Sequence, residues 1–228
     1  MHATHHGSAL VLFSGGQDST TCLYWAKERF KRVEAIGFNY GQKHVVELDQ
    51  AATIARDADV PFHVSDIRGT LRGSALTEHE KDVSAAHEKD GSLPASFVPG
   101  RNALFLTLAA GHAYTRDISD LVGGMCQTDY SGYPDCRRAF VDAICVSLSL
   151  AMEIDFRIHT PLMYLTKAET WKLATELGIV DIIREQTHSD YNGDRSTLHE
   201  WGYGNLDNPA SILRKKGYDE AKANGWIK

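Results

Sequence analysis

The stretch "ALVLFSGGQDSTTCLYWA", residues 9–26, places two glycines and an Asp-Ser pair directly after an apolar run. The apolar residues 9–13 predict a buried strand, and Cys22, Leu23 and Ala26 recur at the spacing of a helix. Unpaired N–H groups at the start of such a helix attract an anion, and glycines let the backbone approach that anion closely. The turn therefore suits the pyrophosphate of a nucleotide, although no Gly-Lys-Ser/Thr follows it as in a Walker loop.

The polar residues of this turn are hydrogen-bond donors and one carboxylate. The hydroxyls of Ser14 and Ser19 add donors to the backbone amides, whereas Asp18 would repel a phosphate unless it binds a magnesium ion or caps the helix. A turn that only caps its helix would have the same composition, so the turn alone leaves both interpretations open. The expected phosphate cradle comprises Ser14, Gly15, Gly16, Gln17, Asp18 and Ser19.

Apolar runs alternate with segments of helical period along most of the chain. This order is typical of an α/β fold in which a parallel sheet is covered by helices on both faces. Further strands are expected at residues 33–40, 120–124 and 155–160, and further helices at residues 45–58, 103–114, 137–152 and 166–179.

Two segments interrupt this alternation. Residues 68–99 are polar and have no clear period, which predicts a long loop that closes over substrate as a lid. From residue 187 onward the pattern dissolves, and only a short Lys-rich helix is expected, near residues 210–216. We therefore expect a nucleotide-binding catalytic domain at residues 1–186 and a small irregular appendage at residues 187–228.

Composition bounds the class of protein. At 228 residues, 43% of them hydrophobic, the chain can bury a full core. The net charge of -6 argues against nucleic acid as a direct partner, because nonspecific binding to phosphates depends on clustered Lys and Arg. No apolar run reaches the roughly 18 residues of a membrane-spanning helix. The four cysteines form no Cys-x-x-Cys pair, so neither disulfides nor secretion is indicated, and we expect a cytoplasmic protein.

Several longer motifs occur along the chain. They are "SGGQDSTTCL" (14–23), "FNYGQKH" (38–44), "FVPGRNALFLTLAA" (97–110), "GMCQTDYSGYPDCR" (124–137) and "TPLMYLTKAETW" (160–171). In this order they resemble the 7-cyano-7-deazaguanine synthase (QueC) family of queuosine biosynthesis, a family of PP-loop ATP pyrophosphatases. The resemblance spans residues 9 to about 218 and implies a Rossmann-like fold of the adenine nucleotide alpha-hydrolase type.

The activity that this resemblance implies is that of an ATP-dependent C–N ligase acting on 7-carboxy-7-deazaguanine. In such enzymes the carboxylate is adenylated, ammonia displaces AMP to give an amide, and a second adenylation dehydrates the amide to the nitrile. This chemistry needs a phosphate cradle, a magnesium ion and a positive charge near the leaving pyrophosphate. A homodimer is also expected from the resemblance.

Asp18, Lys167 and Arg101 are the residues expected to act on the nucleotide. Asp18 is the expected magnesium ligand, and Lys167 opens a helix where a cation would face the α-phosphate or the pyrophosphate. A solvated lysine in a first helical turn is the alternative for Lys167. Arg101 is interpreted as a contact to the nucleotide or the substrate carboxylate, with a structural salt bridge as its alternative. The expected adenosine pocket comprises Tyr40, Gly41 and Gln42, at the end of the second strand.

The loop after the strand at residues 120–124 is expected to bind the base. Tyrosines can stack on a purine-like ring, and a carboxylate can accept hydrogen bonds from the two adjacent N–H groups of a guanine-like edge. An Asx-turn with surface tyrosines would have a similar composition. The expected contacts are Asp129 and Asp135 to the edge, Tyr130 and Tyr133 to the ring, and Gln127 and Thr128 as supporting residues.

The C-terminal segment departs from the family. Members resembling this chain carry four zinc-binding cysteines there, and in this sequence Asp190, Asn205, Asn208 and Ser211 stand at the matching positions. Amides, a hydroxyl and one carboxylate are poor zinc ligands, so we expect no zinc.

Two explanations of this departure compete. In the first, a polar hydrogen-bond network closes the segment over an unchanged active site. In the second, the four positions form a recess in which Asp190 attracts a cationic amine. The activated acyl group would then pass to a protein amine such as an N-terminus and form a nucleobase–protein conjugate. Relatives of the family occur in antiphage operons of the CBASS type, which makes this the alternative function.

Other classes of function fit the sequence less well. A PP-loop enzyme that thiolates tRNA would need a catalytic cysteine pair and a basic surface, and neither is evident. A binding module without catalysis would tolerate the loss of Asp18, Lys167 or Arg101, yet all three are present.

Overall fold

Five parallel strands form the sheet that positions the functional residues. In the computed structural model they are β1 (Ser8–Leu12), β2 (Arg32–Asn39), β3 (Phe62–Asp66), β4 (Asp120–Val122) and β5 (Arg157–His159), in the spatial order β3-β2-β1-β4-β5. The structure describes residues 7–41, 46–70, 97–128, 133–187, 195–206 and 209–227. Because β1 lies in the centre, the turn that follows it opens at the middle of the sheet's carboxyl edge.

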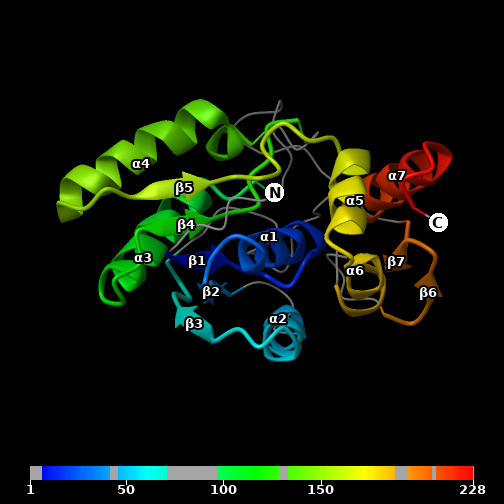
Figure 1. Cartoon of the computed structure of the whole chain (residues 1–228), viewed down its shortest axis with the longest axis horizontal. Helices are drawn as coiled ribbons and strands as arrows, with labels where there is room; N and C mark the ends of the chain where they lie inside the picture. Colours follow the sequence, from blue (N-terminus) through cyan, green and yellow to red (C-terminus); the bar gives the residue numbers. More distant parts are fainter. Residues whose placement is uncertain are drawn as a thin grey trace.

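Helices cover both faces of this sheet (Figure 1). The first pair, α1 (Gln17–Lys27) and α2 (Val46–Asp57), packs on one face, and α3 (Arg101–Tyr114) and α4 (Arg138–Met152) pack on the other. None of the helices in the described ranges is long and apolar enough to cross a membrane. The α/β fold with helices on both faces, expected from the alternating pattern, is confirmed.

Alternation along β1 explains why the sheet has two apolar faces. Ala9 and Val11 belong to the cluster shared with α1 and α2, whereas Leu10 belongs to the cluster shared with α3 and α4. Successive side chains of a strand point to opposite faces, so a central strand that is covered twice must be apolar throughout. This is why the run at residues 9–13 contains no polar residue.

The elements that follow β5 lie together beyond the sheet, at the right of Figure 1. They are α5 (Lys167–Glu176), α6 (Val180–Gln186), a short antiparallel pair of β6 (Leu198–His199) and β7 (Gly202–Tyr203), and α7 (Pro209–Ala223). Their shared core contains Trp171 of α5, Ile183 of α6, Trp201 of the hairpin and Tyr218 of α7. Side chains on both sides of residue 186 thus pack into one cluster, and the division of the chain at that residue stays a prediction.

Five elements differ from the sequence-based expectation. Strand β3 was not expected, because it is a half-exposed edge strand that lacks a continuous apolar run. Helix α6 was not expected, because it begins directly after a Leu-Gly helix stop. The strands of the hairpin were not expected, because each has only two residues. Helix α7 runs well past the expected end at residue 216, because Gly217 lies inside it rather than terminating it.

A buried carboxylate ties the first residues of β4 and β5 together. Asp120 is 4% exposed and accepts hydrogen bonds from Arg157 Nε and Nη2, both at 2.9 Å, while His159 Nε2 lies 2.7 Å from its Oδ1. Burial opposes ionisation, but the bonds from His159 and Arg157 outweigh it and lower the pKa of Asp120 to about 2. The ionised form therefore stabilises the fold.

We predict that Asp120→Asn destabilises the protein by about 2 kcal/mol at neutral pH, because a native pKa of about 2 lies nearly two units below the ordinary value. A carboxyl with a lowered native pKa stabilises above its ordinary pKa of 3.8, and this contribution is lost as the pH falls toward 2. Urea unfolding of both proteins at pH 6 and at pH 2.5 measures the difference. A difference that stays constant between the two pH values would contradict this assignment.

Candidate active site

Hydroxyl contacts hold the turn after β1 in one conformation. Ser14 N donates to Ser19 Oγ at 3.2 Å, the two hydroxyls lie 3.1 Å apart, and Ser19 Oγ donates to the Gly16 carbonyl at 3.2 Å. Gly15 has a φ of +78°, and a Cβ there would lie 3.0 Å from the backbone of Ala51 in α2. Only glycine therefore fits between the turn and α2.

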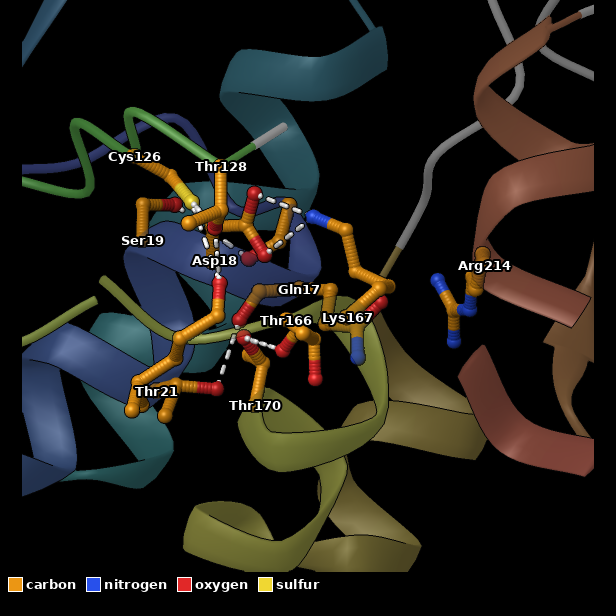
Figure 2. Close-up of polar contacts among 12 residues, drawn as sticks. Gln17, Asp18, Ser19, Thr21, Cys126, Thr128, Thr166, Lys167, Thr170 and Arg214 are labelled. Carbon is orange, nitrogen blue, oxygen red and sulfur yellow. Dashed lines mark hydrogen bonds and ion pairs between the residues drawn. The ribbon is translucent and has the colours of Figure 1, made fainter. Parts of the chain in front are cut away.

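Asp18 does not cap the helix that it opens. The N-cap of α1 is Gly16, which makes no side-chain cap bond. Instead the Asp18 carboxylate receives hydrogen bonds from Lys167 Nζ at 3.0 Å and 2.9 Å (Figure 2). The pair joins residues 149 positions apart, with the Lys167 side chain 12% and the Asp18 side chain 31% exposed. Lys167 is therefore not a solvated surface lysine, and the pair lies at the edge where a nucleotide is expected.

A capping box fixes the start of the helix that carries Lys167. Glu169 N donates to Thr166 Oγ1 at 3.2 Å, and Thr166 N donates to Glu169 Oε2 at 2.8 Å. This arrangement satisfies backbone donors at the helix start and fixes the position at which α5 begins. The first residue of α5 consequently has one defined place opposite the turn after β1.

The loop after β4 packs against the same region. Gly124 lies beside Asp18, where an added Cβ would be 3.4 Å from the Asp18 Cβ. Cys126 Sγ and Thr128 Oγ1 lie 3.1 Å apart, and both donate to the Leu165 carbonyl (Figure 2). Thr128 is therefore tied to the residues before α5.

Gln127 anchors the same loop to α4. Its Oε1 accepts a hydrogen bond from Arg138 N at 3.0 Å, and its own backbone N donates to the Met163 carbonyl at 2.9 Å. Gln127 and Thr128 thus have structural contacts in addition to the supporting role predicted for them.

The N-terminus of α3 collects three more of the predicted residues. Arg101 is its first residue, with its guanidinium carbon 5.9 Å from the centre of the Tyr133 ring. Asp135 is buried, and its Oδ2 accepts a hydrogen bond from Asn102 N at 3.0 Å. One oxygen of Asp135 thus serves the helix start, which makes its role at least partly structural.

Tyr40 and Gly41 follow β2 at the same edge of the sheet. The Tyr40 ring centre lies 5.6 Å from that of Phe105 in α3, and Gly41 N donates to Asn39 Oδ1 at 3.3 Å. The structure therefore brings the predicted adenosine residues, as far as it describes them, to the carboxyl end of the strand next to β1.

The family model described as "Queuosine biosynthesis protein QueC" matches residues 8–222. The chain belongs to the QueC family. A 7-cyano-7-deazaguanine synthase of Bradyrhizobium sp. strain BTAi1 is 50% identical, over 96% of this chain and 97% of that protein. A second one, of Rhodopseudomonas palustris strain BisB18, is 51% identical over 96% of each chain. The family resemblance expected from the motifs is confirmed.

Solved structures are more distant. One, described as a predicted subunit of a tRNA methyltransferase from Methanocaldococcus jannaschii, is 20% identical over 75% of each chain with a TM-score of 0.48.

Five of the predicted site residues lie outside the described residues. They are Gln42, Asp129, Tyr130, Asp190 and Asn208. Of the proposed acceptor recess, the structure describes exposed Asn205 and buried Ser211. The recess therefore stays a prediction.

Two cysteines of this QueC protein, Cys22 and Cys136, have a raised pKa and are therefore not nucleophiles at neutral pH. Burial raises the pKa of Cys136 to about 11 and raises that of Cys22 well above its ordinary value. Both thiols therefore stay protonated at neutral pH.

One group of possible metal ligands occurs in the described part of the chain. The ligand atoms of Glu34, His63 and His112 all lie within 4.8 Å of one another, near the amino ends of β2 and β3. Arg116 Nε donates to Glu34 Oε2 at 2.5 Å, and Arg32 Nε lies 3.9 Å from Oε1. The two guanidiniums already neutralise this carboxylate, so we interpret the group as an ion-pair network at the edge opposite the nucleotide site.

Sequence reasoning missed two glycines that border the site. Gly124 packs on Asp18, and a Cβ on Gly217 of α7 would lie 2.7 Å from Lys167 Cγ. For Gly217 the available signal was a glycine that continues a helical pattern, which usually has a packing reason, whereas Gly124 lies in a loop and gave no such signal.

We predict that Gly15→Ala weakens ATP binding about tenfold or more and destabilises the fold, because the new methyl group meets the Ala51 backbone at the phosphate turn. Gly178→Ala is the matched control, since Gly178 has a φ of +69° and open space around its Cβ position. It should cost only the backbone strain of about 1–2 kcal/mol and leave ATP affinity intact. Calorimetric titration with ATP and thermal unfolding measure both; equal ATP affinity in the two variants would rule the contact out as a determinant.

Proposed function

We propose that the chain uses ATP to convert 7-carboxy-7-deazaguanine into 7-cyano-7-deazaguanine, the product for which its relatives are named. Besides family membership, one structural observation supports this proposal. The two charged residues expected to handle the phosphates, Asp18 and Lys167, meet at 2.9 Å on the turn and helix that the family motifs supply. A carboxylate that can hold a magnesium ion and a cation near the leaving pyrophosphate are the groups that this chemistry uses.

The phosphates of ATP would lie on the turn formed by residues 14–19. The backbone amides at the start of α1 and the Ser14 and Ser19 hydroxyls supply donors, and Lys167 supplies the positive charge. Lys167 would exchange its contact with Asp18 for one with the phosphates. This exchange keeps the charges in the site balanced when nucleotide enters.

Asp18 is the residue that would hold a magnesium ion. Its carboxylate is partly exposed and makes no helix cap, and magnesium in proteins commonly takes one or two carboxylates together with substrate phosphates. When bound, the ion neutralises charge on the phosphates. Asp18 would orient it, while Lys167 takes up the charge that develops on the leaving pyrophosphate.

The first chemical step forms a mixed anhydride. A carboxylate oxygen of the deazapurine acid attacks the α-phosphorus of ATP, and the bond between that phosphorus and the bridging oxygen of pyrophosphate breaks. Ammonia then attacks the acyl carbon, AMP leaves, and the nitrogen loses a proton to give the amide. A second ATP adenylates the amide oxygen, and departure of AMP with loss of the remaining N–H protons gives the nitrile.

The base would lie near the N-terminus of α3. Arg101 and Tyr133 face one another there, which supports an arginine contact to the substrate carboxylate and a ring stacked on the tyrosine. The second oxygen of Asp135 and the side chains of Gln127, Thr128, Asp129 and Tyr130 complete the proposed base site. Tyr40, Gly41 and Gln42 would contact the adenosine.

Ammonia is the acceptor that we propose, because the relatives similar over nearly the whole chain carry the synthase name. The C-terminal segment would work without zinc, since the four cysteines lie at positions 22, 126, 136 and 145, away from that segment. We further propose a cytoplasmic homodimer. A protein amine received near Asp190, Asn205, Asn208 and Ser211 is the competing outcome of the assay below.

The test supplies purified protein with Mg-ATP, 7-carboxy-7-deazaguanine and ammonium ion, and identifies the products by mass spectrometry. We predict the nitrile together with AMP and pyrophosphate, formed only when the acid is present. A protein whose mass rises by the deazaguanine acyl group would overturn the choice of ammonia, and intact ATP would overturn the function.

We also predict that Lys167→Ala lowers kcat about 10²- to 10³-fold, because the charge it supplies acts on the leaving group in a desolvated site. Lys172→Ala is the control, since Lys172 lies on the exposed face of the same helix and pairs with Glu176. That variant should keep near-normal kcat. Equal losses in the two lysine variants would show that Lys167 has no special role.

A further inference from the structure

Helix α7 presses directly on the residue that carries the catalytic charge. A Cβ on Gly217 would lie 2.7 Å from Lys167 Cγ, 2.8 Å from its Cβ and 2.9 Å from its backbone carbon. The last of these atoms belongs to the backbone, so a side-chain rotation of Lys167 could not relieve the contact. Only glycine lets α7 lie this close to the start of α5. The aliphatic part of the Lys167 side chain therefore packs directly against α7.

Arg214, one turn earlier on the same helix, ties α7 to its surroundings. Its guanidinium is buried and donates through Nε to the Trp201 carbonyl at 2.8 Å, through Nη1 to Thr187 Oγ1 at 2.9 Å and through Nη2 to the Ile183 carbonyl at 2.7 Å. These partners belong to the hairpin, to the residue after α6 and to α6 itself. One side chain thus fixes three segments against α7.

The same arginine also fixes α7 to α5. Trp171 Nε1 donates to the Arg214 carbonyl at 3.2 Å, and the guanidinium carbon lies 5.7 Å from the centre of the Trp171 ring. Gly202 must lack a side chain here, because its Cβ would meet Arg214 Nη2 at 2.2 Å. Contacts to α5 on one side, and to α6 and the hairpin on the other, therefore fix the position of α7 relative to Lys167.

Arg214 also adds charge behind the site. In Figure 2 Lys167 lies between Asp18 and Arg214. Burial lowers the pKa of Arg214 to about 10, which leaves the guanidinium protonated at neutral pH, and the charge of Asp18 opposes that lowering. A positive charge close enough to interact with Asp18 also attracts a phosphate bound beside Asp18.

We propose that helix α7 is a positioning element for the reaction: Gly217 sets the place of the Lys167 side chain, and Arg214 holds the helix at the distance this requires. The proposal rests on the function proposed above for Lys167. It gives the C-terminal segment a role in adenylation, since the residues that place the lysine lie beyond residue 186.

The direct test is a double-mutant cycle on the full chain. Gly217→Ala should lower kcat for acid-dependent ATP cleavage tenfold or more, while Gly111→Ala, a helical glycine with nothing within 4 Å of its Cβ position, should not. In a Lys167→Ala background the Gly217→Ala change should cost no further activity, because both act through one side chain. Losses that multiply in the double variant would overturn the proposal.

A second readout does not depend on activity. Acetic anhydride should label Lys167 several-fold more in Gly217→Ala than in the wild-type protein, with labelling of Lys172 unchanged. Should Gly217→Ala fail to fold, Arg214→Lys, which keeps the charge but cannot make all three bonds, should show the same increase. Unchanged labelling of Lys167 in a folded variant would refute the proposal. If the wild-type protein cleaves no ATP, the proposed function fails, yet labelling still decides whether α7 places Lys167.

Discussion

The ion pair between Asp18 and Lys167 is the contact on which the account of this protein depends. It joins the turn after the central strand β1 to the first residue of α5, across 149 positions of the chain. Two opposite charges at this place can be separated by a nucleotide that offers phosphate to one and a metal ion to the other. The sheet brings the turn to the middle of its carboxyl edge, and the capping box of Thr166 and Glu169 fixes the lysine opposite it.

Much of the sheet could be predicted because its information is local. The run at residues 9–13 is apolar on both faces, as a central strand must be, and the helices that cover it have long periodic patterns. Strand β3 and the hairpin could not be found this way, because an edge strand and two-residue strands carry no such pattern. Helix α7 was expected too short, since a glycine inside a helix can be recognised as a packing contact only when its partner is known.

Some features of the site could likewise be predicted from the sequence, and others required the structure. Asp18 and Lys167 could be chosen from motifs, but the choice between a helix cap and a charge partner for Asp18 required the third dimension. Asp135 shows the converse, because a carboxylate selected for the substrate also accepts a hydrogen bond from a backbone amide at the start of α3. The residues that surround the lysine from α7 lie far along the sequence from it, and a packing distance between two helices leaves no pattern in the chain.

The central claim is that this site activates an acid by joining it to AMP with release of pyrophosphate. Exchange of labelled pyrophosphate into ATP, measured with magnesium but without ammonia, tests that step alone. We predict exchange that needs 7-carboxy-7-deazaguanine and disappears in Asp18→Asn. Exchange that proceeds without the acid, or that survives unchanged in Asp18→Asn, would contradict the claim.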